Sequence, residues 1–451
     1  MTRRATWCLV MTLAAVGCSG GDPPETPLPG GNGELITGRE RLGWDQQAPN
    51  PAELATLRYA IYIDGVRVEM TGVTCAPTPG PAGFACSGVL PPLSPGAHTL
   101  ELATFVATDG VLESSRSAPF RVTVTGAAPG EQARESWTNG DAGITGDGVG
   151  LHVERLVDGL ELPTDAAFAP DGRLFIAERA GRIRIVQGQL RTEAALKIDD
   201  IAPGGGLLAI ALDPEFAETR HVFTLSTAIG SRGPVFRLTR YRELRGVLAQ
   251  RAVLLETPAA VPSAAMRFGP DGMLYVALGG TSPDSPSSYG GKILRLQPDG
   301  RAPRDRRAGL PAISSGHLSP RALAWRPDGN LLWIADGTPD GVEWITGIRA
   351  TDAIPERATW GLPSSETTSS MAFYDGSRIP EFRGDLLIAS PVAQRLMRIK
   401  FGTDPLRAEF SESLLEQRVG PIRVVLVGPD GAIYFCTPTA VGRLQSRIPN
   451  R

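Results

Sequence analysis

The stretch FGPDGMLYVALGG (residues 268–280) contains a tight turn followed by an apolar run. In Pro-Asp-Gly the proline fixes φ at the first turn position and the glycine tolerates a positive φ, so the turn has a physical cause. The run after it is rich in branched and aromatic side chains and has the length of a buried strand. The stretch therefore predicts a hairpin turn that leads into a core strand.

The same pattern of apolar strand, turn and second apolar strand recurs along the chain. Its six copies begin at Phe168, Ile210, Phe268, Trp325, Tyr374 and Val427. A two-stranded hairpin cannot bury its own apolar faces, so successive copies must share a core. Radial repeats of four short strands form β-propellers, whereas a solenoid has shorter and more uniform repeats. The sequence therefore predicts a six-bladed β-propeller over residues 150–446.

Residues 35–126 have a different all-β pattern. Apolar and polar residues alternate between Asp-Gly turns, which predicts a small antiparallel β-sandwich. The stretches YAIYIDGVRV (residues 59–68) and GAHTLELATFVATDG (residues 96–110) resemble fibronectin type III domains, which implies a spacer or adhesion module. The predicted fold class is all-β, with this fibronectin type III or immunoglobulin-like sandwich before the propeller.

The N-terminus has the composition of an export signal. Arg3 and Arg4 precede an apolar run that is too short for a permanent membrane span and ends in AAVGC (residues 14–18). This ending resembles a bacterial lipoprotein signal, which implies removal of residues 1–17 and lipidation of Cys18. A plain secretory signal cut nearby is the alternative. Both predict export, and lipidation predicts a bacterial membrane anchor with the protein facing the periplasm or the cell exterior.

The Pro/Gly-rich composition of residues 18–34 predicts a flexible tether, and residues 127–149 form a second predicted linker. In an oxidising compartment, Cys75 and Cys86, which bracket the Pro/Gly loop CAPTPGPAGFAC, are predicted to form a disulfide. Cys436, in the apolar strand AIYFC, is predicted to be an inert buried thiol.

The charge balance limits the possible partners. The chain has 45 Lys and Arg against 48 Asp and Glu, a formal net charge of −3. This balance predicts no attraction to nucleic acid or to an acidic membrane surface. Contact with a membrane is therefore expected through the lipid anchor only.

The repeats carry a family resemblance. The phrases FAPDGRLFIAERAGRIRIV, GGGLLAIALDPEF, FGPDGMLYVALGG, GHLSPRALAWRPDG and IRVVLVGPDGAIYF resemble the soluble glucose/sorbosone dehydrogenases along almost all of residues 151–444. The resemblance implies a six-bladed propeller that oxidises aldoses with pyrroloquinoline quinone and calcium. Most of the matched residues belong to turns and core strands, so they inform the fold more than the chemistry.

Residues that the resemblance implies for catalysis are replaced in this chain. The general-base histidine, seven residues before the Phe-Gly-Pro-Asp phrase, is Val261, and the nearby arginine position is Ala265. A valine cannot accept the proton that must leave a sugar hydroxyl. No catalytic residue is therefore assigned.

The implied cofactor contacts are also largely replaced. At positions where the resemblance implies polar or cationic side chains for the quinone, this chain has Gly204, Leu318, Ser319, Val392 and Pro421. Arg423 is kept as a candidate cofactor contact, and Glu343 is kept as a candidate calcium ligand. We expect no bound cofactor, with the quinone and calcium present only if the family activity survives.

A few other polar residues are candidates for the mouth of the propeller or for its structure. Arg423, Arg321 and Arg267 either line the mouth or are surface or inter-blade arginines. Glu178 and Arg179 are candidates for pairing with each other. His317, in a turn, is expected to be a hydrogen-bonded structural residue. The aspartates of the Pro-Asp-Gly turns are expected to cap those turns: Asp171, Asp271, Asp328 and Asp430.

Three functional hypotheses follow from these observations. The first is an exported lipoprotein whose propeller has lost its chemistry and binds a carbohydrate or an envelope protein. The second is a working quinone-dependent aldose dehydrogenase with a rearranged site. The third is an adhesion or assembly role carried mainly by the sandwich.

Overall fold

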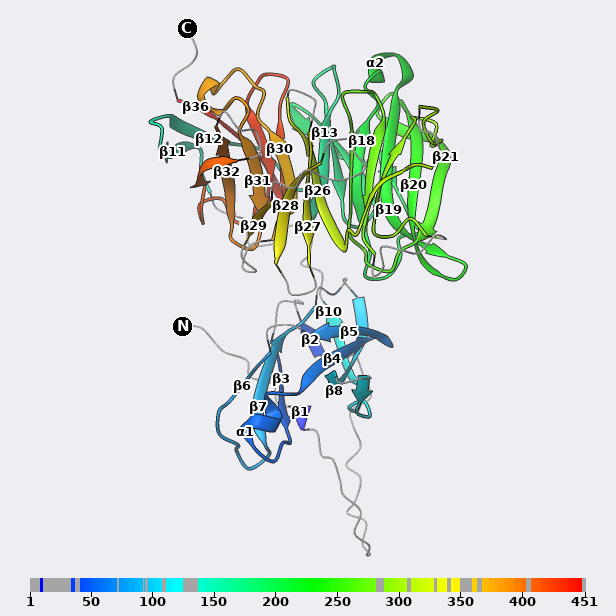
Figure 1. Cartoon of the computed structure of the whole chain (residues 1–451), viewed down its shortest axis with the longest axis vertical. Coiled ribbons are helices and arrows are strands. Elements are labelled where there is room, and N and C mark those ends of the chain that lie inside the picture. The colour runs from blue at the N-terminus through cyan, green and yellow to red at the C-terminus, as the bar shows by residue number, and fades with distance from the viewer. Residues whose placement is uncertain are drawn as a thin grey trace, which may run out of the picture. The chain divides into compact units, whose positions relative to one another are not determined.

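The computed structural model describes residues 9–10, 34–36, 41–70, 73–91, 93, 96–107, 111–124, 137–280, 288–305, 310–327, 331–338, 342–348, 359–362, 367–402 and 407–447. They form two compact units, Met1–Glu131 and Gln132–Arg451, and almost all of their regular structure is β-strand (Figure 1). Within these ranges no helix is long and apolar enough to cross a membrane.

The first unit contains two β-sheets. One has the order β1 (Leu9–Val10), β3 (Arg41–Gln46), β7 (Phe84–Val89), β6 (Thr74–Cys75). The other has the order β2 (Glu34–Ile36), β10 (Phe120–Val124), β8 (Gly96–Ala107), β4 (Arg58–Ile63), β5 (Val66–Met70), with β9 (Val111–Glu113) beside β8. A shared core of buried side chains, including Trp44, Phe84, Leu102 and Val122, confirms the predicted sandwich. Strand β1 lies in the predicted signal, whose removal stays a prediction.

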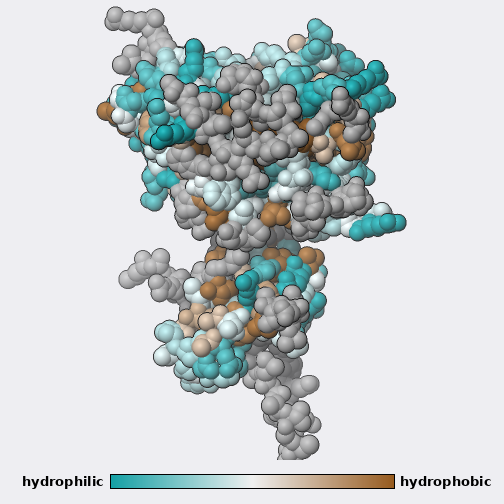
Figure 2. Space-filling model, in the orientation of Figure 1, coloured by the Kyte–Doolittle hydropathy of each residue, from teal (hydrophilic) through white to brown (hydrophobic). Residues whose placement is uncertain are grey.

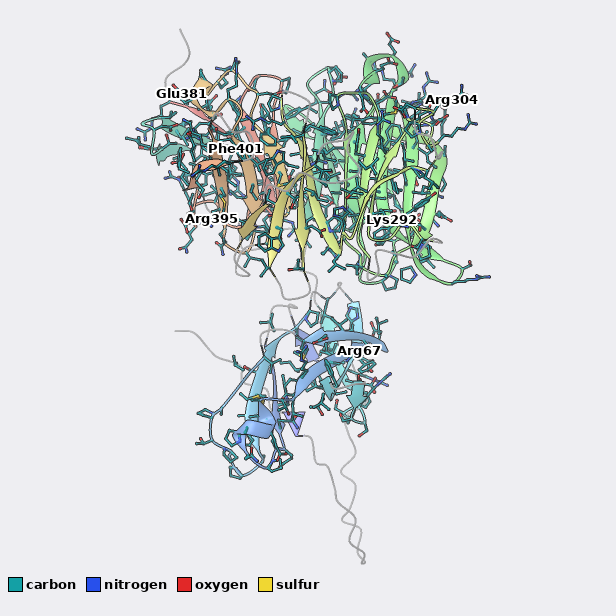
Figure 3. The ribbon with its side chains drawn as sticks, in the orientation of Figure 1. Arg67, Lys292, Arg304, Glu381, Arg395 and Phe401 are labelled. Atoms are coloured by element: carbon teal, nitrogen blue, oxygen red, sulfur yellow. A yellow bond between two sulfur atoms is a disulfide. The ribbon has the colours of Figure 1, made fainter. Side chains whose placement is uncertain are left out.

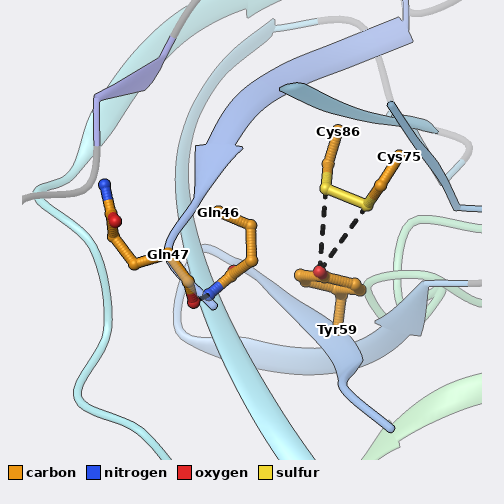
Figure 4. The surroundings of a disulfide bond; sticks show 5 residues. All are labelled: Gln46, Gln47, Tyr59, Cys75 and Cys86. Carbon is orange, nitrogen blue, oxygen red and sulfur yellow. Dashed lines mark hydrogen bonds between the residues drawn. A yellow bond between two sulfur atoms is a disulfide. The ribbon is translucent and has the colours of Figure 1, made fainter. Parts of the chain in front are cut away.

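Two local features stabilise this unit. Helix α1 (Pro51–Leu54) begins after Asn50, whose side chain accepts hydrogen bonds from the N–H groups of Ala52 and Glu53. The predicted disulfide between Cys75 and Cys86 is present and joins β6 to β7. Figure 4 shows the Tyr59 hydroxyl next to both sulfur atoms, 3.8 Å from each.

The second unit consists of six sheets, which we call blades one to six, within the described part of the chain. The first two are β13 (Pro163–Phe168), β14 (Leu174–Glu178), β15 (Arg182–Gln187) with the short strands β16 (Gln189–Leu190) and β17 (Leu196–Lys197), and β18 (Leu207–Leu212), β19 (His221–Gly230), β20 (Gly233–Leu244), β21 (Val247–Pro258). Helix α2 (Phe216–Thr219) joins β18 to β19.

Blades three, four and five follow the same plan. They are β22 (Ala264–Phe268), β23 (Leu274–Leu278), β24 (Lys292–Leu296), β25 (Ala312–Ser315); β26 (Ser319–Trp325), β27 (Leu332–Gly337), β28 (Glu343–Ile348), β29 (Thr359–Leu362); and β30 (Ser370–Phe373), β31 (Leu386–Ser390), β32 (Arg395–Phe401), β33 (Ala408–Leu414). A short 3-10 helix, η1 (Pro380–Phe382), lies between β30 and β31.

Blade six joins the two ends of the unit. Its order is β11 (Gly140–Ile144), β12 (Gly150–Asp158), β36 (Ala440–Ser446), β35 (Ile433–Cys436), β34 (Val424–Val427). The final strand β36 thus pairs with β12, the strand that enters the propeller. Strand β11 lies inside the predicted linker 127–149, so the prediction was wrong for its last part. Its glycine-rich sequence gives little indication of a strand. The segment is a strand because it pairs with β12.

The first strands of the blades form a closed ring in which each packs against the next: β13, β18, β22, β26, β30, β34 and again β13. Between neighbouring blades lie apolar clusters that each contain side chains from both, such as Phe223 with Val276 and Trp333 with Ile388. The predicted six-bladed propeller is therefore confirmed. In the view of Figure 2 the coloured part of its surface is mostly hydrophilic, with apolar residues in small groups.

The Pro-Asp-Gly turns are built as expected. In each described copy a carboxylate oxygen of the aspartate accepts a hydrogen bond from the N–H two residues later, at 3.1–3.2 Å: Asp171 with Arg173, Asp271 with Met273, and Asp430 with Ala432. The following glycines have φ between 71° and 84°, a region that favours glycine. These aspartates are turn caps, while Asp328 lies outside the described residues.

One buried arginine ties blade five to the entering segment of blade six. The Arg398 guanidinium is inaccessible to solvent and donates to Asp147 at 2.7 Å, to Asp385 at 2.6 Å and to Glu412 at 2.7 Å. It also lies 3.8 Å from the centre of the Phe382 ring. Three carboxylates and a ring thus compensate the cost of burying this charge.

Replacing Arg398 with leucine should lower the free energy of unfolding of the propeller by about 3–5 kcal/mol, because Asp385 would remain buried without its cation. Urea unfolding measures the change. The matched control is Arg301→Leu, since Arg301 is 80% exposed in its pair with Asp299 and should change stability by less than about 1 kcal/mol. Equal effects of the two variants would contradict this role of Arg398.

The same network predicts a pH dependence. Hydrogen bonds from Arg398, above all, hold the pKa of Asp147 well below its usual range. A lowered folded-state pKa stabilises the fold above the ordinary value of about 4, and this contribution is lost as the pH falls further. The stability difference between wild type and Asp147→Asn should therefore be largest near neutral pH and shrink below about pH 4. A difference that stays constant down to about pH 3 would refute this.

Candidate functional site at one face of the propeller

Alternation of strand direction brings two kinds of connection to one face of the propeller. The first strand of each blade begins there, and the connection from the second strand to the third lies there as well. We call this the entry face. In Figure 3, Lys292 and Arg395, which begin third strands, lie toward the lower edge of the propeller, whereas Glu381, between first and second strands, lies at the opposite edge.

The positions singled out by the family resemblance gather on the entry face. They precede or begin first strands, lie in second-to-third connections, or begin a third strand: Gly204, Val261, Leu318, Ser319, Val392, Pro421, Arg423 and Glu343. Val261, at the implied general-base position, is partly buried before β22, and Val392 is 62% exposed. The ring therefore brings the implied site together, but it does so with aliphatic and small side chains at most positions.

The centre of the ring holds an ion pair that sequence reasoning missed. Arg267 in β22 reaches past blade two and donates two hydrogen bonds to Asp165 in β13, at 2.7 and 2.8 Å. The same carboxylate accepts N–H groups from Ala166 and from Ile210 in blade two. Arg267 is thus an inter-blade residue with a bidentate partner. The only signal for Asp165 was a charged residue at a strand position that is otherwise apolar.

His317 is held by hydrogen bonds on both ring nitrogens. Its Nε2 lies 2.8 Å from the Ser314 hydroxyl of blade three, and its Nδ1 lies 3.0 Å from the Asp336 carboxylate of blade four. Asp336 also accepts the N–H of Ser319 at 2.8 Å. The order serine, histidine, aspartate is that of a hydrolase relay, but here it joins the last strand of blade three to the second strand of blade four. His317 is the expected structural histidine.

Glu343, the candidate calcium ligand, is buried at the start of β28. Its two carboxylate oxygens lie 3.1 Å from the N–H of Thr368, and Arg321 lies 3.6 Å away. Burial raises the pKa of this carboxyl. Ca²⁺ takes about 6–8 oxygen ligands. Among the residues that the structure describes, no group of three or more His, Cys, Asp or Glu side chains is placed to hold a metal ion. Among the described residues, Glu343 therefore lacks the further acidic ligands that calcium would need.

Glu178 and Arg179 do not pair with each other, so that expectation was wrong. Glu178 accepts a hydrogen bond from Arg182 at 2.8 Å and another from the N–H of Glu161. Arg182 lies directly opposite Glu178 across the β14–β15 hairpin, whereas Arg179 follows the strand and points elsewhere. Arg179 instead donates to the carbonyl oxygen of Gly204 at 3.2 Å.

Arg423, the candidate cofactor contact, lies on the entry face close enough to Arg179 for the two charges to interact. Its Nε donates to the carbonyl oxygen of Pro163 at 2.9 Å. Burial, with a contribution from the Arg179 charge, lowers the pKa of Arg423, and burial lowers that of Arg179. Sequence reasoning found each arginine separately. It did not find that blades one and six bring them together.

Comparisons with known proteins agree with this architecture. The sequence profile of the family described as Glucose / Sorbosone dehydrogenase matches residues 160–353 and 345–446, so the chain belongs to this family. Aldose sugar dehydrogenase YliI of Escherichia coli is 27% identical over 355 residues, covering 66% of this chain and 93% of that protein. Hedgehog-interacting protein of Mus musculus is 29% identical over 182 residues, covering 33% of this chain and 26% of that protein.

A solved structure has the same fold, and the match extends over the whole of its chain. It is described as a putative oxidoreductase (glucose dehydrogenase) from Thermus thermophilus and has a TM-score of 0.56 and 30% sequence identity. The match covers 65% of this chain and 100% of that chain. The similarity to sugar dehydrogenases therefore covers the propeller.

Replacing Arg267 with leucine should destabilise the propeller by about 3 kcal/mol, because Asp165 would be left buried without its cation. Thermal and urea unfolding measure the loss. The double variant Arg267→Leu with Asp165→Asn should recover part of it, since the unpaired charge is then removed. A double variant less stable than the single one would show that the ion pair is not the cause.

Proposed function

We propose that this protein is an exported, lipid-anchored carbohydrate-binding protein whose dehydrogenase-like propeller has lost its redox chemistry. The observation that carries the proposal is the replacement of the implied base by Val261 within an otherwise intact ring. A positioned base contributes about 10²–10⁴-fold to such a proton transfer, and an aliphatic side chain contributes none of it.

Within the second unit, no other histidine is placed to act in its stead. The chain has four histidines. His98 belongs to the first unit, His152 lies in β12 and His221 begins β19 at the opposite face. His317 is on the entry face, but its ring nitrogens are occupied by Ser314 and Asp336. A base would therefore require breaking a contact that joins two blades.

The residues at the implied quinone contacts are a poor fit for that cofactor. Pyrroloquinoline quinone carries three carboxylates, which call for charge-assisted hydrogen bonds. Leu318, Val392 and Pro421 supply none through their side chains. Arg423 alone keeps a cation at a matched position, so we propose that the quinone and calcium are not bound.

Carbohydrate is the preferred ligand class because the relatives are named for sugars. The names of the Escherichia coli and Thermus thermophilus proteins refer to aldose and glucose. The name of Hedgehog-interacting protein, in contrast, describes a binding partner, which supports a binding role for such a propeller and leaves an envelope protein as the alternative ligand. Lipidation at Cys18 and the tether 18–34 would hold the protein at the envelope.

The second candidate function is a quinone-dependent aldose dehydrogenase with a rearranged site. Family membership favours it, and so does the retention of Arg423 and Glu343. It differs from the first in requiring a bound redox group.

A quinone titration separates the two functions. Purified protein mixed with pyrroloquinoline quinone and calcium should show no bound-quinone absorbance and no reduction of an acceptor dye by aldoses. The variant Val261→His should also remain inactive, because the cofactor contacts are missing as well as the base. Bound quinone together with aldose-dependent dye reduction by the wild type would overturn the loss of function.

A further inference from the structure

One short segment of the entry face contacts two arginines through neighbouring backbone carbonyls. Leu162 accepts the backbone N–H of Arg179 at 3.0 Å, and Pro163, the next residue, accepts the side-chain Nε of Arg423 at 2.9 Å. Arg179 follows the second strand of blade one, and Arg423 precedes the first strand of blade six. Closure of the ring therefore creates the pair.

These two guanidinium groups are not neutralised by the described residues. Neither forms an ion pair there, whereas several other buried or partly buried arginines contact at least one carboxylate: Arg173, Arg182, Arg237, Arg267 and Arg398. Each of the two uses its side chain for one hydrogen bond to a carbonyl oxygen, Gly204 for Arg179 and Pro163 for Arg423. A guanidinium has five N–H donors, so several remain available at each group.

Two neighbouring, partly buried cations without a counter-charge cost stability. The lowered pKa of Arg423 has burial and the charge of Arg179 as its causes, but an arginine remains protonated at any physiological pH. The described residues therefore leave this repulsion uncompensated. An anion between the two groups would relieve it and gain charge-assisted hydrogen bonds from both.

Of the glycines before β18, Gly204 borders open space and Gly206 lies against one of the arginines. A Cβ built at Gly204 would have no described atom within 4 Å, and this residue has φ +71°. A Cβ at Gly206 would lie 2.7 Å from Cγ of Arg179, so glycine at that position allows the arginine stem to lie against the backbone. Open space thus adjoins the Gly204 carbonyl, to which Arg179 is bonded.

We propose that Arg179 and Arg423 bind the carboxylate of an acidic sugar, such as a uronate unit. This inference rests on the proposed carbohydrate-binding function and names its ligand class. A planar carboxylate matches the bidentate geometry of guanidinium groups, and the hydroxyls of the sugar ring suit the free carbonyl lone pairs beside them. The two arginines recognise charge, while neutral contacts elsewhere on the entry face would position the ring.

The test compares matched ligands and matched variants. Titration calorimetry of the full chain is carried out with trigalacturonic acid and with neutral galactotriose. We expect binding of the acidic trisaccharide only, weakened by added salt. Arg179→Gln and Arg423→Gln should each weaken it at least about tenfold, Arg423→Lys should weaken it less than Arg423→Gln, and the exposed-site control Arg301→Gln should bind as the wild type does.

A stability measurement accompanies the titrations. Because the arginines repel each other, Arg179→Gln and Arg423→Gln should melt at the same temperature as the wild type or higher, so weaker binding could not come from misfolding. A clear loss of stability in both would mark them as structural residues and overturn the proposal.

The remaining outcomes separate this inference from the function on which it rests. Equal binding of both trisaccharides, unchanged in the arginine variants, would overturn the acidic ligand and leave carbohydrate binding in place. A sulfated or phosphorylated galactose that binds in preference to trigalacturonic acid would overturn the carboxylate. Failure of all these sugars, with binding of pyrroloquinoline quinone that depends on Arg423, would overturn both.

Discussion

Closure of the ring is the constraint on which the rest of the propeller depends. Each blade buries its faces only against its neighbours, so the last blade must meet the first. Strand β36 achieves this by pairing with the entering strand β12. Arg398 then fastens the connection before β12 to blade five through Asp147, 251 residues away in sequence. The hydrogen bonds between β12 and β36 and the buried charge of Arg398 thus both stabilise the junction at which the ring closes.

In a closed ring, the fold does not depend on the side chains that would carry out the chemistry. The strands and Pro-Asp-Gly turns fix the positions of the entry-face residues, but they do not depend on what those residues are. Val261 and Val392 therefore occupy positions of implied function without disturbing the strands beside them. The arginines discussed above are of two kinds, with and without a carboxylate partner. Arg267 is matched by Asp165, whereas Arg179 and Arg423 have no such partner among the described residues.

Much of the architecture could be predicted because its causes are local. The turn chemistry, the repeated apolar strands and the Cys75–Cys86 loop all act over a few residues, and the structure contains each of them. The failures were non-local. Strand β11 forms because it pairs with β12. The partner of Glu178 is on the opposite strand of a hairpin and is not the next residue in the chain. Neither pairing can be inferred from the local composition.

The sequence by itself determined the number of blades and the residue types at the implied catalytic positions, because both are properties of short segments. Only the tertiary structure decided which charges meet. Arg267 and Asp165 are 102 residues apart, and Arg179 and Arg423 come from the first and last blades. Ion pairing and repulsion depend on distance in space, and that distance is set when the ring closes.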